Sequence, residues 1–446
     1  MTTIALTSLG CTRNLADSEV MLGRLARDGV KVCDDIEGVD VVIINTCGFI
    51  REAVEESIDA ISQFCGLKKD GRLKKVIAAG CLVQRYGEEL VRELPEVDGF
   101  LGVNDWAVID RVVREVLAGK RVVELAGQPR IEDRNGHGVA LTPPHFRYVK
   151  ICEGCNHKCT FCAIPAIKGK LRSRSPDSVL AEVRGILEEG AKEIVLIGQD
   201  TAEFGHDRGD PKSLPKLLRA MCALDRDFWV RLLYSCPTHF TPELLEVIAG
   251  EDKICRYVDL PVHHVDAGIL RAMGRRETPE NIVRLIRRIR QMIPEVSIRT
   301  SLIVGFPGEG EKEFRRLLDF VRDTEFERLG AFEFSAEEGT PAAEMPGQAP
   351  EEVKRERFDR LMRLQQKIST ENNRKLLGKR QRIIVDEWGE HPDYRCVGRT
   401  EGDAPEVDGC VYVKGRTARP GEFVKVEFTG SLEYDMIARE LDEPSQ

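Results

Sequence analysis

Short apolar runs alternate with amphipathic stretches over the first 126 residues of the chain. The runs Ile4–Leu9, Val41–Ile44 and Val76–Ala79 are followed by segments of helical periodicity, for example Ser18–Asp28. This alternation is typical of a parallel sheet with right-handed crossover connections. We therefore predict an α/β domain at residues 1–126.

A second strand–helix series follows residues 127–144, which are rich in glycine, proline and charge, as is typical of a linker. Six apolar runs and a long helix at 350–377 predict a parallel barrel, full or partial, at residues 145–377. Reactive groups lie at the carboxyl ends of the strands in such folds. The predicted strands are Arg147–Cys152, Glu193–Ile197, Trp229–Tyr234, Tyr257–Leu260, Val296–Val304 and Leu329–Phe334.

The last segment, residues 378–446, changes to short alternating strands separated by turns that contain glycine. This pattern predicts a small all-β barrel. The predicted strands are Arg382–Val385, Cys410–Val413 and Phe423–Phe428.

Composition narrows the class of protein. The chain is 42% hydrophobic and 32% charged, and no apolar stretch approaches the ~20 residues of a membrane helix, so we expect a cytoplasmic protein without a membrane partner. The net charge of −9 argues against a simple nucleic-acid binder, although it leaves room for a local basic patch. Fourteen cysteines in a reducing compartment indicate metal or redox chemistry where they cluster.

The densest cluster is Cys155, Cys159 and Cys162, with the spacing C-x3-C-x2-C. Three thiolates on a tight loop can ligate three irons of a [4Fe–4S] cluster and leave the fourth iron open to an external ligand. A zinc site is the alternative, but zinc prefers four ligands in paired units, and ligation by His157 inside the loop would be strained. Cys152 ends an apolar run before the loop and is expected to be a buried small side chain.

Three further cysteines, Cys11, Cys47 and Cys81, follow the three N-terminal apolar runs at separations of 36 and 34 residues. If the three strands are parallel neighbours, these cysteines meet at the carboxyl edge of the sheet, where open α/β sheets bind ligands. Chance placement of three among many cysteines is the alternative. Their shared position within each unit favours a second three-thiolate iron–sulfur site.

Turns after two of the barrel strands are candidates for contacts with a cofactor. Gln199 and Asp200 follow one predicted strand, and Gly305 follows another, where a missing side chain lets the backbone approach a ligand. A lone histidine is more often structural than catalytic, so no role is assigned to three histidines near strand ends. They are His239, His263 and His264.

The loop from Cys155 to Cys162, with Phe161 before its last cysteine, resembles the signature of radical S-adenosylmethionine (SAM) enzymes. The resemblance extends over nearly the whole chain, because residues 378–446 resemble a TRAM domain and the N-terminal part is similar to that of methylthiotransferases. It implies an N-terminal parallel α/β domain, a central (β/α)6 partial barrel and a C-terminal TRAM barrel. The N-terminal segments that carry the similarity are Ser8–Asn14, Asp17–Glu19, Asn45–Cys47 and Ala79–Cys81.

Within that family the chain resembles the branch that modifies a protein. The resemblance implies transfer of a methylthio group to the β-carbon of an aspartate in a small-subunit ribosomal protein, free or in the assembled ribosome. Glutamine commonly stands in the family at the position of His263, which leaves a cofactor role for His263 open. The matching segments are Lys150–Cys155, Phe161–Pro165, Gly169–Arg174, Gly198–Thr201 and Pro261–His264.

The resemblance also implies two [4Fe–4S] clusters, one on each cysteine triad, with SAM as a further cofactor. The cluster on the barrel loop would cleave SAM to a 5′-deoxyadenosyl radical, which abstracts hydrogen from an unactivated carbon that no side-chain base can deprotonate. The cluster on the N-terminal triad would hold the sulfur that a second SAM methylates. An electron donor and a sulfur donor are then needed as partners.

Charge gives an independent indication of the substrate. Residues 378–446 carry ten basic and fifteen acidic side chains, a net charge of −5, which suits a basic protein better than RNA. We expect Glu401, Asp403, Glu406 and Asp408 to attract such a substrate. The alternatives are a tRNA adenosine methylthiotransferase and, from another class, an iron–sulfur or zinc protein without catalysis, which would need fully ligated metals.

Overall fold

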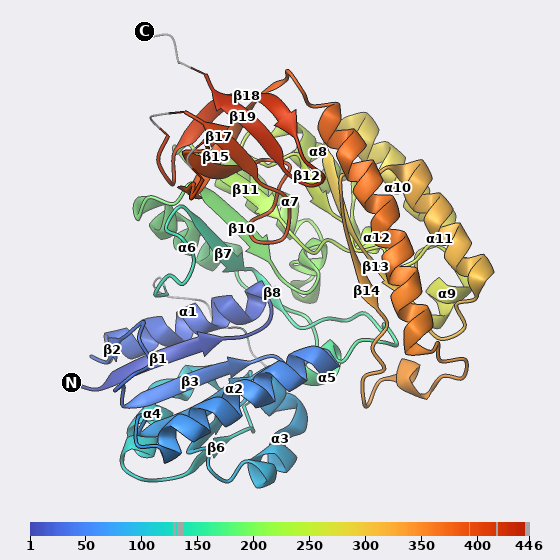
Figure 1. Ribbon diagram of the computed structural model, residues 1–446. Coiled ribbons are helices and arrows are strands. Elements are labelled where there is room, and N and C mark those ends of the chain that lie inside the picture. The colour runs from blue at the N-terminus through green and yellow to red at the C-terminus, as the bar shows by residue number, and fades with distance from the viewer. Residues whose placement is uncertain (128–130, 132–137, 392, 416–417, 442–446) are drawn as a thin grey trace.

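The computed structural model describes residues 1–127, 131, 138–391, 393–415 and 418–441. Three parts follow one another in space as they do along the chain (Figure 1). The N-terminal α/β part lies at one end, a partial barrel lies in the middle, and a small β-barrel lies at the other end. Half of the predicted linker at 127–144, namely residues 128–130 and 132–137, falls outside the described residues.

The N-terminal part is a six-stranded parallel sheet with the strand order β2-β1-β3-β4-β5-β6. Alternate residues of β3 face opposite sides: Val41 and Ile43 pack with α1 and α4, whereas Val42 and Ile44 pack with α2 and α3. Three of the six strands are the predicted ones, and the other three have only two or three residues. The strands are β1 (Thr3–Ser8), β2 (Lys31–Val32), β3 (Val41–Thr46), β4 (Lys75–Gly80), β5 (Gly99–Leu101) and β6 (Val122–Glu124). The helices are α1 (Thr12–Arg27), α2 (Arg51–Lys69), α3 (Cys81–Glu93) and α4 (Ile109–Leu117).

The middle part contains six parallel strands in two sheets, β11-β10-β7 and β12-β13-β14. A bridge between Val230 and Ile254 joins the sheets, and β7 and β14 do not pair within the described residues, so the barrel is partial. The strands are β7 (Phe146–Lys150), β10 (Glu193–Ile197), β11 (Trp229–Leu232), β12 (Tyr257–Asp259), β13 (Ser297–Val304) and β14 (Arg328–Glu333), and a short hairpin joins β8 (Cys152–Glu153) to β9 (Arg172–Ser173). The helices are α5 (Ile164–Lys168), α6 (Pro176–Glu188), α7 (Ser213–Cys222), α8 (Pro242–Gly250), α9 (Ala267–Ala272), α10 (Pro279–Met292), α11 (Glu311–Thr324) and α12 (Glu351–Arg374).

The C-terminal part is a closed five-stranded barrel in the order β15-β16-β17-β19-β18. Its core is a separate cluster of alternating strand residues such as Ile383, Val385 and Val413. The predicted all-β barrel is confirmed, although two of its strands were not predicted. The strands are β15 (Arg380–Trp388), β16 (Cys396–Thr400), β17 (Val411–Lys414), β18 (Phe423–Ser431) and β19 (Met436–Glu440). No helix in the described ranges is long and apolar enough to cross a membrane.

The segment 401–408 of the C-terminal barrel docks on the amino ends of the middle strands. Asp403 accepts from the Arg328 side chain at 2.9 Å, and Asp408 accepts from the Tyr257 hydroxyl at 2.7 Å. Glu401 and Glu406 also accept hydrogen bonds from the middle part. The expectation that these four acids face a basic substrate is therefore wrong for Asp403 and Asp408, whose side chains are buried against the partial barrel, whereas Glu401 is partly exposed and Glu406 is exposed.

Candidate active site

The three cysteines of the barrel loop lie between β8 and α5, at the carboxyl ends of the middle strands. The loop is fixed by its backbone: the amide of Cys155 donates to the Gly169 carbonyl at 3.1 Å, and that of Thr160 donates to the Met273 carbonyl at 3.0 Å. Burial raises the pKa of Cys155 to about 12. Cys152 lies before the loop in the hydrophobic core, fully buried.

Two hydrogen-bond donors point at the sulfurs of this loop. The backbone amide of His157 lies 3.4 Å from Cys155 Sγ, and the Arg275 guanidinium lies 3.8 Å from Cys159 Sγ. Arg275 is held by Glu277 at 2.7 Å. Such donors stabilise negative charge on sulfur, which suits a metal-bound thiolate.

The second cysteine triad lies at the carboxyl ends of three adjacent strands of the N-terminal sheet. Cys11 follows β1, Cys47 follows β3, and Cys81 begins α3 directly after β4. A Cβ atom added to Gly10 would lie 2.6 Å from the Cβ of Cys47, and Cys81 interacts electrostatically with both other thiols. The structure therefore brings the three cysteines together, and their role as cluster ligands stays a prediction.

Two asparagines fix the strand ends that carry this triad. The Asn14 side chain donates to the carbonyls of Leu9, at 2.7 Å, and Asn45, at 3.1 Å. The Asn45 side chain in turn donates to the Asn14 carbonyl and to Ser18 Oγ, at 2.9 and 2.8 Å. This buried network gives a physical reason for the polar residues around the cysteines, for which the sequence offered only a resemblance.

A cavity of about 360 Å³ lies between the N-terminal part and the middle part. This volume is in the range of small-molecule sites. Its wall contains the three loop cysteines, with Arg13, Phe49 and Ile50 from the N-terminal part. Barrel residues complete it, among them Gln199, Tyr234, His263, Ser301, Phe332 and Phe334.

Three buried polar atoms of the cavity wall have no hydrogen-bond partner within the described residues: Gln199 Oε1, His263 Nδ1 and Arg275 Nε. The other end of the Gln199 amide donates to Glu153 at 2.5 Å. Burial lowers the pKa of His263, so its imidazole is neutral at neutral pH. Polar atoms left open beside a three-cysteine loop fit a polar cofactor such as SAM, which leaves Gln199 as a candidate contact.

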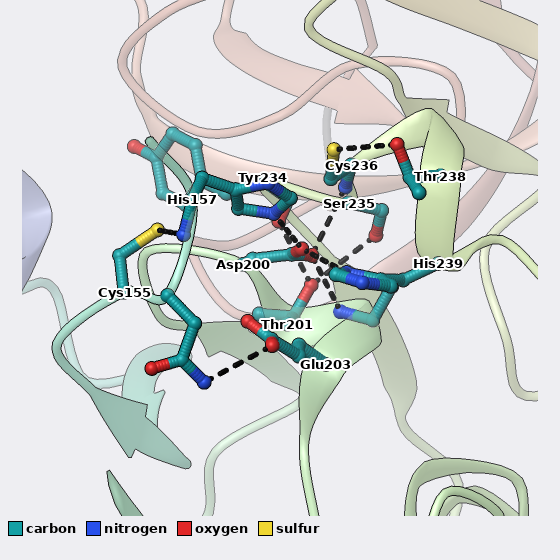
Figure 2. A network of polar contacts seen from close by, with 12 residues as sticks. Cys155, His157, Asp200, Thr201, Glu203, Tyr234, Ser235, Cys236, Thr238 and His239 are labelled. Carbon is teal, nitrogen blue, oxygen red and sulfur yellow. Dashed lines mark hydrogen bonds and ion pairs between the residues drawn. The ribbon is translucent and has the colours of Figure 1, made fainter. Parts of the chain in front are cut away.

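Asp200 also lines the cavity, and both oxygens of its carboxylate are within hydrogen-bond distance of neighbouring groups. Oδ2 lies 2.8 Å from His157 Nε2 and 2.7 Å from His239 Nδ1, and Oδ1 accepts from the backbone amides of Ala202 and Cys236 (Figure 2). Burial would raise the pKa of Asp200, but these hydrogen bonds lower it well below its ordinary value. Asp200 thus positions the cluster loop through His157, and Gln199 is the better candidate for a contact with SAM.

Gly305 lies outside the residues that line the cavity. Its φ is +72°, and an added Cβ atom would lie 2.4 Å from Cγ of Lys354 in α12. Close packing of α12 therefore explains this glycine, and we leave it out of the proposed cofactor site.

Arg13 is a charged cavity residue to which the sequence analysis assigned no role. Its guanidinium donates to the Gly198 carbonyl at 3.2 Å and stacks 4.6 Å from the centre of the Tyr234 ring. Burial raises the pKa of Cys11, but Arg13, the backbone amide of Asn14 and Lys168 together outweigh burial, and the net shift is downward. The same cation also acts on Cys162. Arg13 therefore interacts with one cysteine of each triad. Its position two residues after Cys11 is the feature of the sequence that could have identified it.

Three family models match successive parts of the chain: the uncharacterized protein family UPF0004 at residues 3–102, the radical SAM superfamily at 149–321 and the TRAM domain at 377–440. In fold, the chain resembles TsrM from Kitasatospora setae, a radical S-adenosylmethionine methyltransferase, with a TM-score of 0.55 and 16% identity over 74% of this chain and 73% of that one. Fold, cysteine loop and cavity together define a radical SAM enzyme.

Two curated relatives carry the name ribosomal protein uS12 methylthiotransferase RimO. The protein of Geobacter sulfurreducens is 44% identical over 97% of each chain, and that of Clostridioides difficile is 44% identical over 99% of this chain and 100% of its own. The chain belongs to the RimO family and is a radical SAM methylthiotransferase. Its cofactors accordingly include SAM and an iron–sulfur cluster.

Proposed function

We propose that this methylthiotransferase acts on ribosomal protein uS12, at the β-carbon of an aspartate. The observation that carries the proposal is similarity to RimO proteins over almost the full length of both chains. In the overall change, the β-carbon loses one hydrogen and gains one methylthio group. A reductant and a sulfur donor take part as partners.

Two [4Fe–4S] clusters are part of the proposal. Cys155, Cys159 and Cys162 would hold one, and the N-terminal triad the other, each with one iron free of protein ligands. When bound, such clusters supply reductive cleavage of SAM and a carrier for the transferred sulfur. The N-terminal triad does not line the cavity, but Arg13 lines it and interacts with both Cys11 and Cys162, which supports a reaction chamber that adjoins both clusters.

The chain's own residues contribute shape and polarity to this chamber. Phe161 and the buried Phe334 form an apolar wall that limits contact of the reacting carbon with water and stray hydrogen donors. Gln199 and His263 each have a buried polar atom without a partner among the described residues. Hydrogen bonds from these atoms would orient SAM in the chamber. The chamber opens between two domains, which gives a protein loop a route to it.

The test is an anaerobic reaction of the reconstituted enzyme with SAM and a reductant. Purified uS12, small ribosomal subunits and bulk tRNA are incubated separately and analysed by mass spectrometry. We expect one methylthio group on an aspartate of uS12 and no change in tRNA nucleosides. A methylthiolated adenosine with unmodified uS12 would contradict the substrate assignment.

Iron content tests the two clusters separately. Replacing the three loop cysteines by Ala should remove about half of the iron and abolish SAM cleavage, whereas replacing the N-terminal triad should remove about half but preserve cleavage. Cys152→Ala is the matched control, because Cys152 is buried in the core and should keep all the iron. Only four irons per wild-type chain would contradict the second cluster.

A further inference from the structure

Four side chains of types that can ligate a metal ion lie close together at the cluster loop. His157 comes from that loop, Asp200 and Glu203 follow β10, and His239 follows β11 (Figure 2). One ligand atom from each lies within 4.8 Å of those of the other three. Both histidine nitrogens approach the same oxygen, Asp200 Oδ2, at 2.8 and 2.7 Å.

The carboxylate of Glu203 gives a second indication that a cation binds here. The residue is 6% exposed, and its Oε2 atom has no hydrogen-bond partner within the described residues. Its other oxygen accepts from the Asn156 amide at 3.2 Å. A buried carboxylate oxygen without a partner is unfavourable, and a cation at this position would supply the missing partner.

We propose that His157, Asp200, Glu203 and His239 bind one divalent metal ion of the zinc type. Two imidazole nitrogens and two carboxylate oxygens form a ligand set that zinc accepts in tetrahedral geometry. The two carboxylates neutralise the charge of a divalent ion, and both histidines bind as neutral imidazoles, because only an unprotonated ring nitrogen has a lone pair for the metal. Four protein ligands leave no open position, which makes the site structural.

The metal ion ties the cluster loop to the ends of two barrel strands. His157 lies between Cys155 and Cys159 in sequence, while the other ligands belong to segments after β10 and β11. The ion therefore limits movement of the loop whose cysteines line the cavity. This site lies beyond the proposed function, so failure of the zinc proposal would leave the proposal of methylthio transfer to uS12 standing.

The first experiment uses the full-length protein, reconstituted with iron and sulfide and then supplied with Zn²⁺ alone as the probe. Elemental analysis should find one zinc per chain in addition to the iron. Zinc K-edge X-ray absorption should show nitrogen and oxygen ligands at about 2.0–2.1 Å. The absence of zinc, or sulfur ligands at about 2.3 Å, would overturn the proposal, because sulfur would place zinc on the cysteines.

Variants locate the site. Glu203→Gln keeps the size of the side chain and His239→Asn removes a ligand, and each should weaken zinc binding at least about tenfold while the iron content is retained. His145→Asn is the matched control, since His145 is also buried and lies 2.8 Å from a carboxylate, Asp386, but outside the site. Equal zinc binding by Glu203→Gln and the wild type would overturn the proposal even if His239→Asn failed to fold.

Discussion

At the scale of single residues, Glu193 shows how the middle part and the C-terminal barrel are joined. Its carboxylate is 0% exposed and lies 2.6 Å from Arg231 and 2.8 Å from Arg399 of the C-terminal barrel. Burial would raise the pKa of Glu193, but the two guanidiniums lower it from 4.5 to about 2. The charged form is therefore the one that holds the two parts together.

This shift gives a prediction for acid stability. The unfolded chain takes up the Glu193 proton near pH 4.5 and the folded chain only near pH 2, so stability present above pH 4.5 is lost as the pH falls between these values. Glu193→Gln should be less stable at neutral pH but should lose less unfolding free energy in this window, measured by urea denaturation. Glu188→Gln, on an exposed helix position, is the control and should follow the wild type.

Single residues were predictable from the sequence where a local pattern fixed them. The shared position of Cys11, Cys47 and Cys81 after three strands was enough to predict that they lie close together. Asp200 was singled out as a cofactor contact, but its partner His239 lies 39 residues away in sequence, and such pairing has no local signal. The acids of segment 401–408 were read as surface charge for the same reason, because their partners lie in another domain.

At the scale of secondary-structure elements, periodicity predicted all six barrel strands, and the predicted bounds of β10, Glu193–Ile197, coincide with the structure. Short elements escaped, since the two or three residues of β2, β5 and β6 cannot display a period. β16 and β19 were missed because arginine and glutamate interrupt their apolar alternation. The order of the strands in the N-terminal sheet could not be predicted beyond the assumption that its three predicted strands are parallel neighbours.

The turn between β1 and α1 gives the second prediction. Gly10 and Gly29 both have positive φ, +84° and +81°, so Ala at either position should cost about 1–2 kcal/mol of unfolding free energy. Only at Gly10 would the added methyl group meet Cys47, whereas Gly29 has no neighbour within 4 Å. Gly10→Ala should therefore also lower the iron bound by the N-terminal triad, measured in the protein lacking the three loop cysteines. Equal iron in the two variants would contradict this.

At the scale of the whole molecule, the two flanking parts close opposite ends of the partial barrel (Figure 1). The N-terminal part covers the carboxyl ends of the strands, where Arg85 lies 2.8 Å from Glu337 and Asp17 pairs with Lys150 and Lys168. The C-terminal barrel covers the amino ends through the segment 401–408. The reaction chamber is therefore enclosed by the N-terminal part, and the C-terminal barrel is free to hold a substrate by other surfaces.

Because the segment 401–408 contacts the middle part, we expect a basic substrate to contact other acids of the C-terminal barrel, which are exposed. Glu387, Glu390 and Asp393 lie near the β15–β16 connection and are exposed. Their replacement by Lys should weaken binding of uS12 at low salt, and the difference should vanish near 1 M salt, where the Debye length is about 3 Å. Fluorescence titration measures both. Asp403→Asn is the control: it should lower stability, because Arg328 loses its partner, but leave binding unchanged. Unaltered uS12 binding by the Lys variant would contradict an electrostatic role for this barrel.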